Sequence, residues 1–437
     1  MNTDQQMTMN DMILVSVDDH IVEPANMFDK HIPAAYKDKA PYVVHTNGAD
    51  NWVIEGRKLA NMGLNGVAGR PREEYGVEPA GYADMRKGCW DVNARVDDMN
   101  ANGVLGSINF PTFAGFAGNA FLTCKDKTAT EVIIQAYNDW HVDEWCAAAP
   151  GRFIACGVLP LWDVELCVKE VKRLAAKGVR TVTFPDAPHL AGLPSLHTGY
   201  WTPLWKAMSD AGMVISSHIG SGRAAPIPSP EAPFDIWITT MPMSIATSAA
   251  DWLYSPVFRD FPNLKIALSE GGIGWVPYFV ERADFTYEHH RAWTNNNFGK
   301  DKPSERFYKH FITCFIDDDF GLANIDKMNS RGVTWECDYP HSDCTWPNAP
   351  EYAWKGIKHL PKNQIDEITH LNVMREFNYD PFTTLGRENC TVGALRKAAA
   401  HVDTSPTHGL GGYNPARRDG SQVTTAEVFA LFAEQAV

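Results

Sequence analysis

Residues 214–222 read VISSHIGSG, a short apolar run that ends in a histidine and a glycine-rich loop. Two later segments follow the same plan: residues 266–275, IALSEGGIGW, and residues 333–341, VTWECDYPH. Short runs rich in β-branched residues predict β-strands, and runs that are apolar on both faces are typical of a buried parallel sheet. Each strand is followed directly by a side chain that can bind a metal.

Outward from these segments, short apolar runs alternate with helical patterns from residue 13 almost to residue 360, which predicts repeated βα units. The series favours an α/β fold of the (β/α)8 barrel type, because no GxGxxG or P-loop at a strand end supports an open doubly wound sheet. The eight runs are Ile13–Val17, Val104–Phe110, Phe153–Leu159, Val179–Phe184, Met213–Ser217, Lys265–Ser269, Phe311–Ile316 and Val333–Glu336.

Three segments depart from a minimal barrel, which we place at residues 12–360. Residues 41–92 form an insertion after the first strand, with a predicted hairpin (Tyr42–Thr46, Trp52–Ile54), and we expect it to cover the active site. Residues 361–402 form a helical extension. Residues 403–437 form a linker and a terminal helix, Val428–Val437, which follows a capping box at residues 424–427 and needs a surface on this chain or on a neighbouring subunit.

Composition excludes several classes of protein. The formal net charge is −14, with 39 Lys and Arg against 53 Asp and Glu, and no basic stripe predicts a nucleic-acid partner. The nine cysteines are scattered without a CxxC pair, and no export signal or apolar run of about 20 residues is visible. We therefore expect a cytoplasmic protein that does not span a membrane and that acts on a small molecule.

Potential metal ligands follow four of the predicted strands. Because carboxyl ends of strands converge on one face of a barrel, we expect these side chains to form one metal site. Three of them, His218, Glu270 and Asp338, are also the candidate catalytic residues. The predicted metal ligands are Asp18, His20, His218, Glu270, Asp338 and His341.

The segments SVDDHIVEP, SSHIG, LKIALSEGGIGW and CDYPHSDCTWP resemble the amidohydrolase-related branch of the amidohydrolase superfamily, over about residues 12–380. This branch includes metal-dependent hydrolases and non-oxidative decarboxylases of the aminocarboxymuconate-semialdehyde type. The resemblance implies a distorted TIM barrel with a divalent metal at Asp18, His20, His218 and Asp338.

The chain departs from that pattern at Glu270, where the decarboxylases usually have a histidine. Nor does the fourth strand, which ends TVTFPDAPH, offer a lysine for the carbamate bridge of many two-metal members. Glu270 is the natural substitute bridge. His341 either completes a second coordination sphere or hydrogen-bonds Asp338 or substrate. Imidazoles and carboxylates without thiolates suit two iron or manganese ions at least as well as zinc.

The carboxylate-rich site favours a dinuclear non-haem Fe/Mn monooxygenase, similar to the hydroxylases of 2-aminoisobutyrate, that uses dioxygen to hydroxylate a C–H bond of a small carboxylated or amino-acid-like substrate. One alternative is a metal-dependent hydrolase or non-oxidative decarboxylase of a small carboxylic acid. Another is a structural barrel subunit that supports a catalytic partner. We expect a homo-oligomer or a hetero-oligomer with a related barrel subunit, and candidate substrate contacts at Arg223, Tyr339 and His189.

Overall fold

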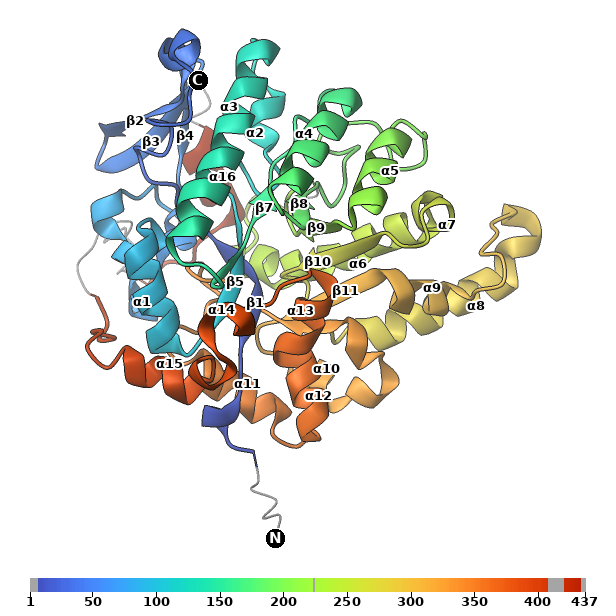
Figure 1. The fold of residues 1–437 in the computed structure, drawn as a ribbon. Coiled ribbons are helices and arrows are strands. Elements are labelled where there is room, and N and C mark those ends of the chain that lie inside the picture. The colour runs from blue at the N-terminus through green and yellow to red at the C-terminus, as the bar shows by residue number, and fades with distance from the viewer. Residues whose placement is uncertain (1–6, 223–224, 408–419, 434–437) are drawn as a thin grey trace.

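Parallel strands lie at the centre of the molecule and helices pack around them (Figure 1). The computed structural model describes residues 7–222, 225–407 and 420–433. All eight predicted runs are confirmed, and the third is divided into two short strands at Ala155. The strands are β1 (Val15–His20), β5 (Gly106–Phe110), β6 (Phe153–Ile154), β7 (Cys156–Gly157), β8 (Thr181–Thr183), β9 (Val214–His218), β10 (Lys265–Ser269), β11 (Phe311–Phe315) and β12 (Val333–Trp335).

These strands form two parallel groups, in the order β1-β5-β6 and β7-β8-β9-β10-β11-β12. At one junction β6 and β7 follow each other along the chain. At the other junction, Asp338 N donates to Asp18 O at 2.8 Å and His20 N donates to Tyr339 O at 2.7 Å. These two bonds join the first strand to the segment after the last one. The arrangement is that of a distorted (β/α)8 barrel, as predicted.

Burial on both sides explains why these runs form strands. In β9, Val214 packs in one apolar cluster with residues from several other strands, whereas Ile215 packs with residues of the surrounding helices. The alternation follows from the two-residue period of a strand. In β1 the pairing register shifts between Ser16 and Asp19, a stretch that contains the predicted metal ligand Asp18 and directly precedes His20. Such irregularities re-aim side chains.

The helices confirm the predicted alternation. No described helix combines the length and apolar character that crossing a bilayer requires. The longer helices are α1 (Val92–Asn102), α3 (Lys127–Trp140), α4 (Val164–Ala176), α5 (Thr202–Ala211), α6 (Phe234–Tyr254), α8 (Val276–Thr294), α9 (Pro303–His310), α11 (Ala349–Ile357) and α16 (Thr425–Ala433). The shorter ones are α2 (Asn119–Leu122), α7 (Val257–Asp260), α10 (Asp319–Ala323), α12 (Lys362–Asp366), α13 (Asn372–Glu376), α14 (Phe382–Leu385) and α15 (Val392–Ala398).

The insertion contains an antiparallel sheet of β2 (Tyr42–Thr46), β3 (Ala49–Ile54) and β4 (Arg57–Ala60). Asn47 and Gly48 have φ of 55° and 78°, the positive values that a tight hairpin turn requires. The predicted hairpin is therefore confirmed. The third strand, β4, was not expected, because its four residues include two charged side chains.

The C-terminal helix α16 begins with the predicted capping box. Thr424 N donates to Glu427 Oε2 at 2.8 Å, and Glu427 N donates to Thr424 Oγ1 at 3.4 Å. Val428 is buried against Val77 of the insertion and Phe234 of α6. The surface on which the helix lies is thus another part of this chain. Residues 434–437 of the predicted helix lie outside the described residues, as do residues 408–419 of the predicted linker.

A buried amide holds the third strand segment to two helices. Asn138 of α3 donates to Val158 O at 2.9 Å and to Glu170 Oε1 of α4 at 2.6 Å, and it accepts from Val158 N at 2.9 Å. Asn138→Ala leaves the Val158 amide and carbonyl without these partners and removes one hydrogen bond to Glu170, which Arg173 still pairs, so it should lower the free energy of unfolding by about 2–4 kcal/mol. Urea denaturation measures this loss. The exposed Asn363→Ala is the control, and equal stability of the two variants would contradict the assignment.

Candidate metal centre

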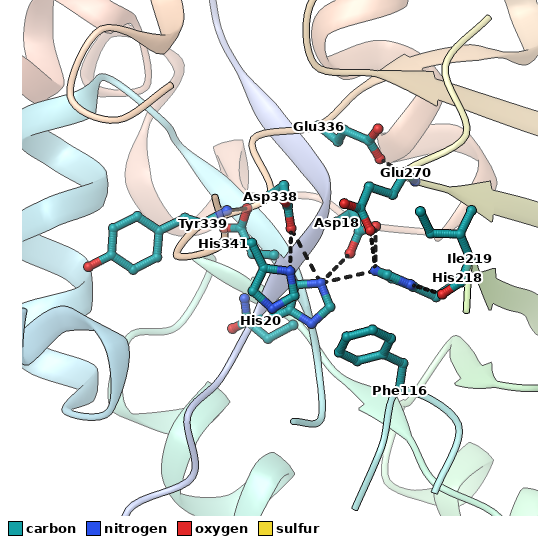
Figure 2. A network of polar contacts seen from close by, with 12 residues as sticks. Asp18, His20, Phe116, His218, Ile219, Glu270, Glu336, Asp338, Tyr339 and His341 are labelled. Atoms are coloured by element: carbon teal, nitrogen blue, oxygen red, sulfur yellow. Dashed lines mark hydrogen bonds and ion pairs between the residues drawn. The ribbon is translucent and has the colours of Figure 1, made fainter. Parts of the chain in front are cut away.

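The six predicted metal-binding side chains meet in one place (Figure 2). Asp18 and His20 come from β1, and His218 ends β9. The remaining three lie just beyond the ends of β10 and β12: they are Glu270, Asp338 and His341. Five of the six are almost completely buried, and the Glu270 side chain is 16% exposed. The sequence prediction that separate strand ends converge here is confirmed.

Two imidazole nitrogens, His20 Nε2 and His218 Nε2, make most of the close approaches in the centre. His20 Nε2 lies 3.4 Å from Asp18 Oδ1, 3.4 Å from Asp338 Oδ1 and 3.1 Å from His218 Nε2. His218 Nε2 lies 3.3 Å from Asp18 Oδ2 and 3.2 Å from Glu270 Oε2. Ligand atoms of Asp18, His20 and His218 lie within 4.8 Å of one another, and so do those of His20, Asp338 and His341. Each set has the composition of a divalent metal site.

The protonation of His218 suits a metal ligand. Its Nδ1 lies 2.7 Å from the Ile219 carbonyl oxygen, so that nitrogen carries the proton and Nε2 presents its lone pair to the centre. Burial lowers the pKa of His218 to about 3, and the pKa of His341 is likewise about 3. Neutral imidazoles are the form that binds metals.

The carboxylates of Asp18 and Asp338 lack hydrogen-bond donors. All four of their oxygens are buried without a hydrogen-bond partner among the described residues. Burial, followed by the neighbouring carboxylates Glu336 and Asp338, raises the pKa of Asp18 well above its usual value. Burial and then Asp343 and Glu336 do the same to the pKa of Asp338. Uncompensated buried charge of this kind is costly, and a bound cation would relieve it.

The backbone is strained where two of these side chains emerge. Glu270 has φ of 60° and Asp338 has φ of 57°, in the left-handed region that residues other than glycine rarely adopt. The Glu270 amide donates to Glu336 Oε2 at 3.1 Å, which helps to hold the conformation. Strain of about 1–3 kcal/mol per residue is typical of functional sites. Both residues are held so that their carboxylates face the centre.

His341 extends the centre on one side. Its ring stacks on His20 with centroids 3.6 Å apart, and its Nδ1 lies 3.1 Å from Asp338 Oδ1. Neither Asp338 Oδ1 nor His341 Nε2 has a hydrogen-bond partner in the described chain. The described residues therefore show no hydrogen bond between His341 and Asp338. His341 thus lies within reach of the centre, and its role as a metal ligand or as a hydrogen-bond partner of substrate stays a prediction.

Two cavities adjoin the centre. The smaller has about 110 Å³ and a mostly apolar wall of Met62, Leu64, Phe116, Ile219, Trp237 and Met241. The larger, of about 1010 Å³, is lined by acidic residues that include Asp317, Asp318 and Glu336. Glu270 lines both cavities. Met62 and Leu64 belong to the insertion, so this segment forms part of the wall of the smaller cavity.

Two of the predicted substrate contacts are corrected, and a third is not described. The Tyr339 hydroxyl donates to Asp98 at 2.6 Å, and its ring points away from the metal residues (Figure 2). It points away because the backbone of Tyr339 pairs with β1, which directs successive side chains to opposite sides. His189 is exposed in a loop and lines neither cavity. Arg223 lies outside the described residues.

Sequence reasoning missed three residues of the site. Trp237 and Met241 line the smaller cavity from α6, four residues apart on one helical face. Nothing in the sequence separates them from ordinary helix packing. Glu336 accepts hydrogen bonds from Cys314 Sγ at 2.6 Å and from the Glu270 amide, and burial raises its pKa to about 7. Its place two residues before Asp338 was an available signal.

A family model described as amidohydrolase matches residues 28–377. The chain belongs to the amidohydrolase family. It is 23% identical over 311 residues to the 2-amino-3-carboxymuconate-6-semialdehyde decarboxylase of Dictyostelium discoideum, with 69% of this chain and 80% of that protein covered.

Two solved structures illustrate the shared fold. An amidohydrolase of Mycobacterium avium subsp. paratuberculosis has a TM-score of 0.63 and 19% identity, over 84% of this chain and 99% of that one. A dihydroxybenzoic acid decarboxylase of a Polaromonas species, solved with bound manganese and the inhibitor 2-nitroresorcinol, has a TM-score of 0.56 and 17% identity, over 84% of this chain and 96% of that one. None of these named relatives is an oxygenase, so the comparisons give no support to the predicted monooxygenase and favour its alternative.

Metal binding should stabilise the folded chain. Added Mn²⁺ offsets the repulsion between the buried carboxylates, so it should raise the unfolding temperature of the metal-free protein. In His218→Ala this increase should shrink or vanish, and the bound metal measured by elemental analysis should fall. His197→Ala, which changes an exposed histidine paired with Asp251, is the matched control. An unchanged response of His218→Ala would exclude His218 as a ligand.

Metal affinity should depend on pH. Because the pKa values of Asp18 and Asp338 are raised, protons compete with the metal for these two carboxylates, and affinity should weaken as pH falls. The pKa values of His218 and His341 are about 3, and burial lowers the pKa of His20 well below its usual value, so these histidines stay neutral over this range. Calorimetric titration with Mn²⁺ from about pH 8 to about pH 6, in buffers of different ionisation enthalpy, measures affinity and released protons. Constant affinity without proton release would contradict the prediction.

Proposed function

We propose that this amidohydrolase is a metal-dependent, non-oxidative decarboxylase of a small carboxylic acid with an apolar body. The family assignment, the decarboxylases among its relatives and the apolar cavity beside the metal centre support the proposal. The observation that carries it is the position of Glu270. This carboxylate lies at the centre, lines both cavities, and is outside the two sets of ligand atoms that lie within 4.8 Å of one another.

The metal fits the residues that are present. Asp18, His20, His218 and Asp338 would hold the ion, and His341 would hold it from the Asp338 side or bind a second one. When bound, a divalent ion supplies positive charge that orients an oxygen of the substrate and stabilises developing negative charge. Manganese is suggested by the Polaromonas relative and by the oxygen and nitrogen donors of the site.

The small cavity would bind the body of the substrate. Its walls are apolar, with Phe116, Trp237 and Met241 facing the space above the metal residues. A substrate held there exchanges the water around its carboxylate for contacts with the protein. Loss of that hydration favours departure of neutral carbon dioxide, because the charged carboxylate is stabilised less than it is in water.

Glu270 would deliver the proton. Burial and the nearby charges of Asp338 and Asp343 raise its pKa well above the usual value, so it holds a proton where an ordinary glutamate would not. When the carbon–carbon bond breaks, carbon dioxide leaves and the electron pair remains on the substrate carbon. The Glu270 proton transfers to that carbon, and water in the larger cavity returns a proton to Glu270. Redox chemistry and an oxidant are not required.

Glu270→Gln tests this role. The variant keeps the shape of the side chain but cannot donate the proton, so the rate of carbon dioxide release should fall by at least about 100-fold. Metal content should stay unchanged. The assay uses manganese-loaded protein and a panel of aromatic and muconate-type carboxylic acids, with simultaneous recording of oxygen uptake. Glu281→Gln, an exposed position on α8, is the control.

Each other outcome selects a different function. Loss of metal from Glu270→Gln would make Glu270 a ligand, in line with the predicted two-ion bridge. Oxygen uptake in proportion to a hydroxylated product would overturn the decarboxylase and restore the monooxygenase. Product formation without carbon dioxide or oxygen uptake would identify a hydrolase.

A further inference from the structure

A further cavity lies at the opposite end of the barrel from the metal centre. It has about 280 Å³ and is bordered by the amino-terminal ends of β10 and β11 and by residues just before β12. Lys265 begins the same strand that leads, at its other end, to Glu270. The charged side chains that line the cavity are Lys265, Lys309, Arg331, Arg375 and Glu376. None of them takes part in the proposed decarboxylation.

Positive charge dominates this cavity. Among its described lining residues, the single carboxylate is Glu376, which forms ion pairs with both Lys265 and Arg375 Nε, the latter at 2.7 Å. Lys309 and Arg331 have no acidic partner in the part of the chain that the structure describes. The lining therefore carries four cations against one anion, in a chain whose formal net charge is −14.

The backbone around Arg331 fixes one of the cationic groups, the guanidinium of Arg375. Arg375 Nη2 donates to the Arg331 carbonyl oxygen at 2.7 Å, and the Arg331 amide donates to Asn329 Oδ1 at 3.2 Å. The neighbouring His310 responds to the same charge. Burial, and then Lys309 together with other nearby cations, lowers its pKa to about 4, despite a contact of 2.7 Å with the Leu264 carbonyl oxygen.

We propose that this cavity is a binding site for a small multivalent oxyanion, such as a phosphate ester or a polycarboxylate. The guanidinium groups of Arg331 and Arg375 match the geometry of such oxygens, and the ammonium groups of Lys265 and Lys309 add charge without demanding an orientation. A volume slightly under the roughly 300–1,000 Å³ of drug-sized sites suits a compact ligand. Because the cavity is remote from the metal, its ligand would bind together with the substrate.

The test is calorimetric titration of the full-length, metal-loaded protein with inorganic phosphate and, separately, with tricarballylate. These probes bear the two oxyanion chemistries, and tricarballylate has no hydroxyl group with which to chelate the metal strongly. The double variant Lys309→Gln/Arg331→Gln should bind the preferred probe at least about tenfold more weakly, and added salt should weaken binding to the wild-type protein. Both substituted residues are exposed, so the fold should be retained.

The matched control is Lys58→Gln/Lys172→Gln, which removes the same net charge at exposed positions elsewhere. It should bind as the wild type does. Tighter binding of phosphate assigns the site to phosphate esters, and tighter binding of tricarballylate assigns it to polycarboxylates. Equal weakening in both double variants, or no binding of either probe to the wild-type protein, would overturn the proposal. The outcome does not depend on catalysis, so it is separate from the test of Glu270.

Discussion

The candidate metal centre lies where the first and last parts of the barrel meet, and there two buried carboxylates repel each other. Asp18 belongs to β1 and Asp338 follows β12, and the Asp338 amide donates to the Asp18 carbonyl oxygen at 2.8 Å. The backbone therefore pulls together two residues whose buried carboxylates repel each other and have no hydrogen-bond donors. A cation is the simplest way to satisfy both. In this fold, the contact between the first strand and the segment after the last strand therefore depends on the same two residues that would bind the metal.

Different parts of the structure around the centre supply the metal-binding groups, the space for substrate and the access for water. The strand ends supply imidazoles that burial keeps neutral and carboxylates that burial makes reluctant to ionise. The apolar cavity on one side of Glu270 and the acidic cavity on the other give that residue access to both substrate and water. Glu336 helps to hold the strained backbone by accepting a hydrogen bond from the Glu270 amide. The Glu270 carboxyl group thus has a raised pKa, and its backbone holds it facing the centre.

The strands and the metal residues could be predicted because both depend on local pattern. A run that is buried on both faces is apolar throughout, and the residue that follows it faces the end of the barrel. The cavity walls depend on tertiary packing instead. Helix α6 is apolar around much of its circumference, so Trp237 and Met241 looked no different from core residues. Tyr339 was misassigned because its neighbour Asp338 faces the metal, and adjacent side chains point in different directions.

The walls of the small cavity come from segments that are not barrel strands. Met62 and Leu64 belong to the insertion and Trp237 belongs to α6, and the C-terminal helix α16 packs against both segments through Val428. Substitutions in these segments can reshape the space for substrate while the strands keep the metal residues in position. Substrate preference can therefore change through the insertion and α6, while the metal-binding residues at the strand ends stay as they are. For the same reason, the cavity-lining residues of the insertion and of α6 are the natural targets for directed evolution of substrate preference.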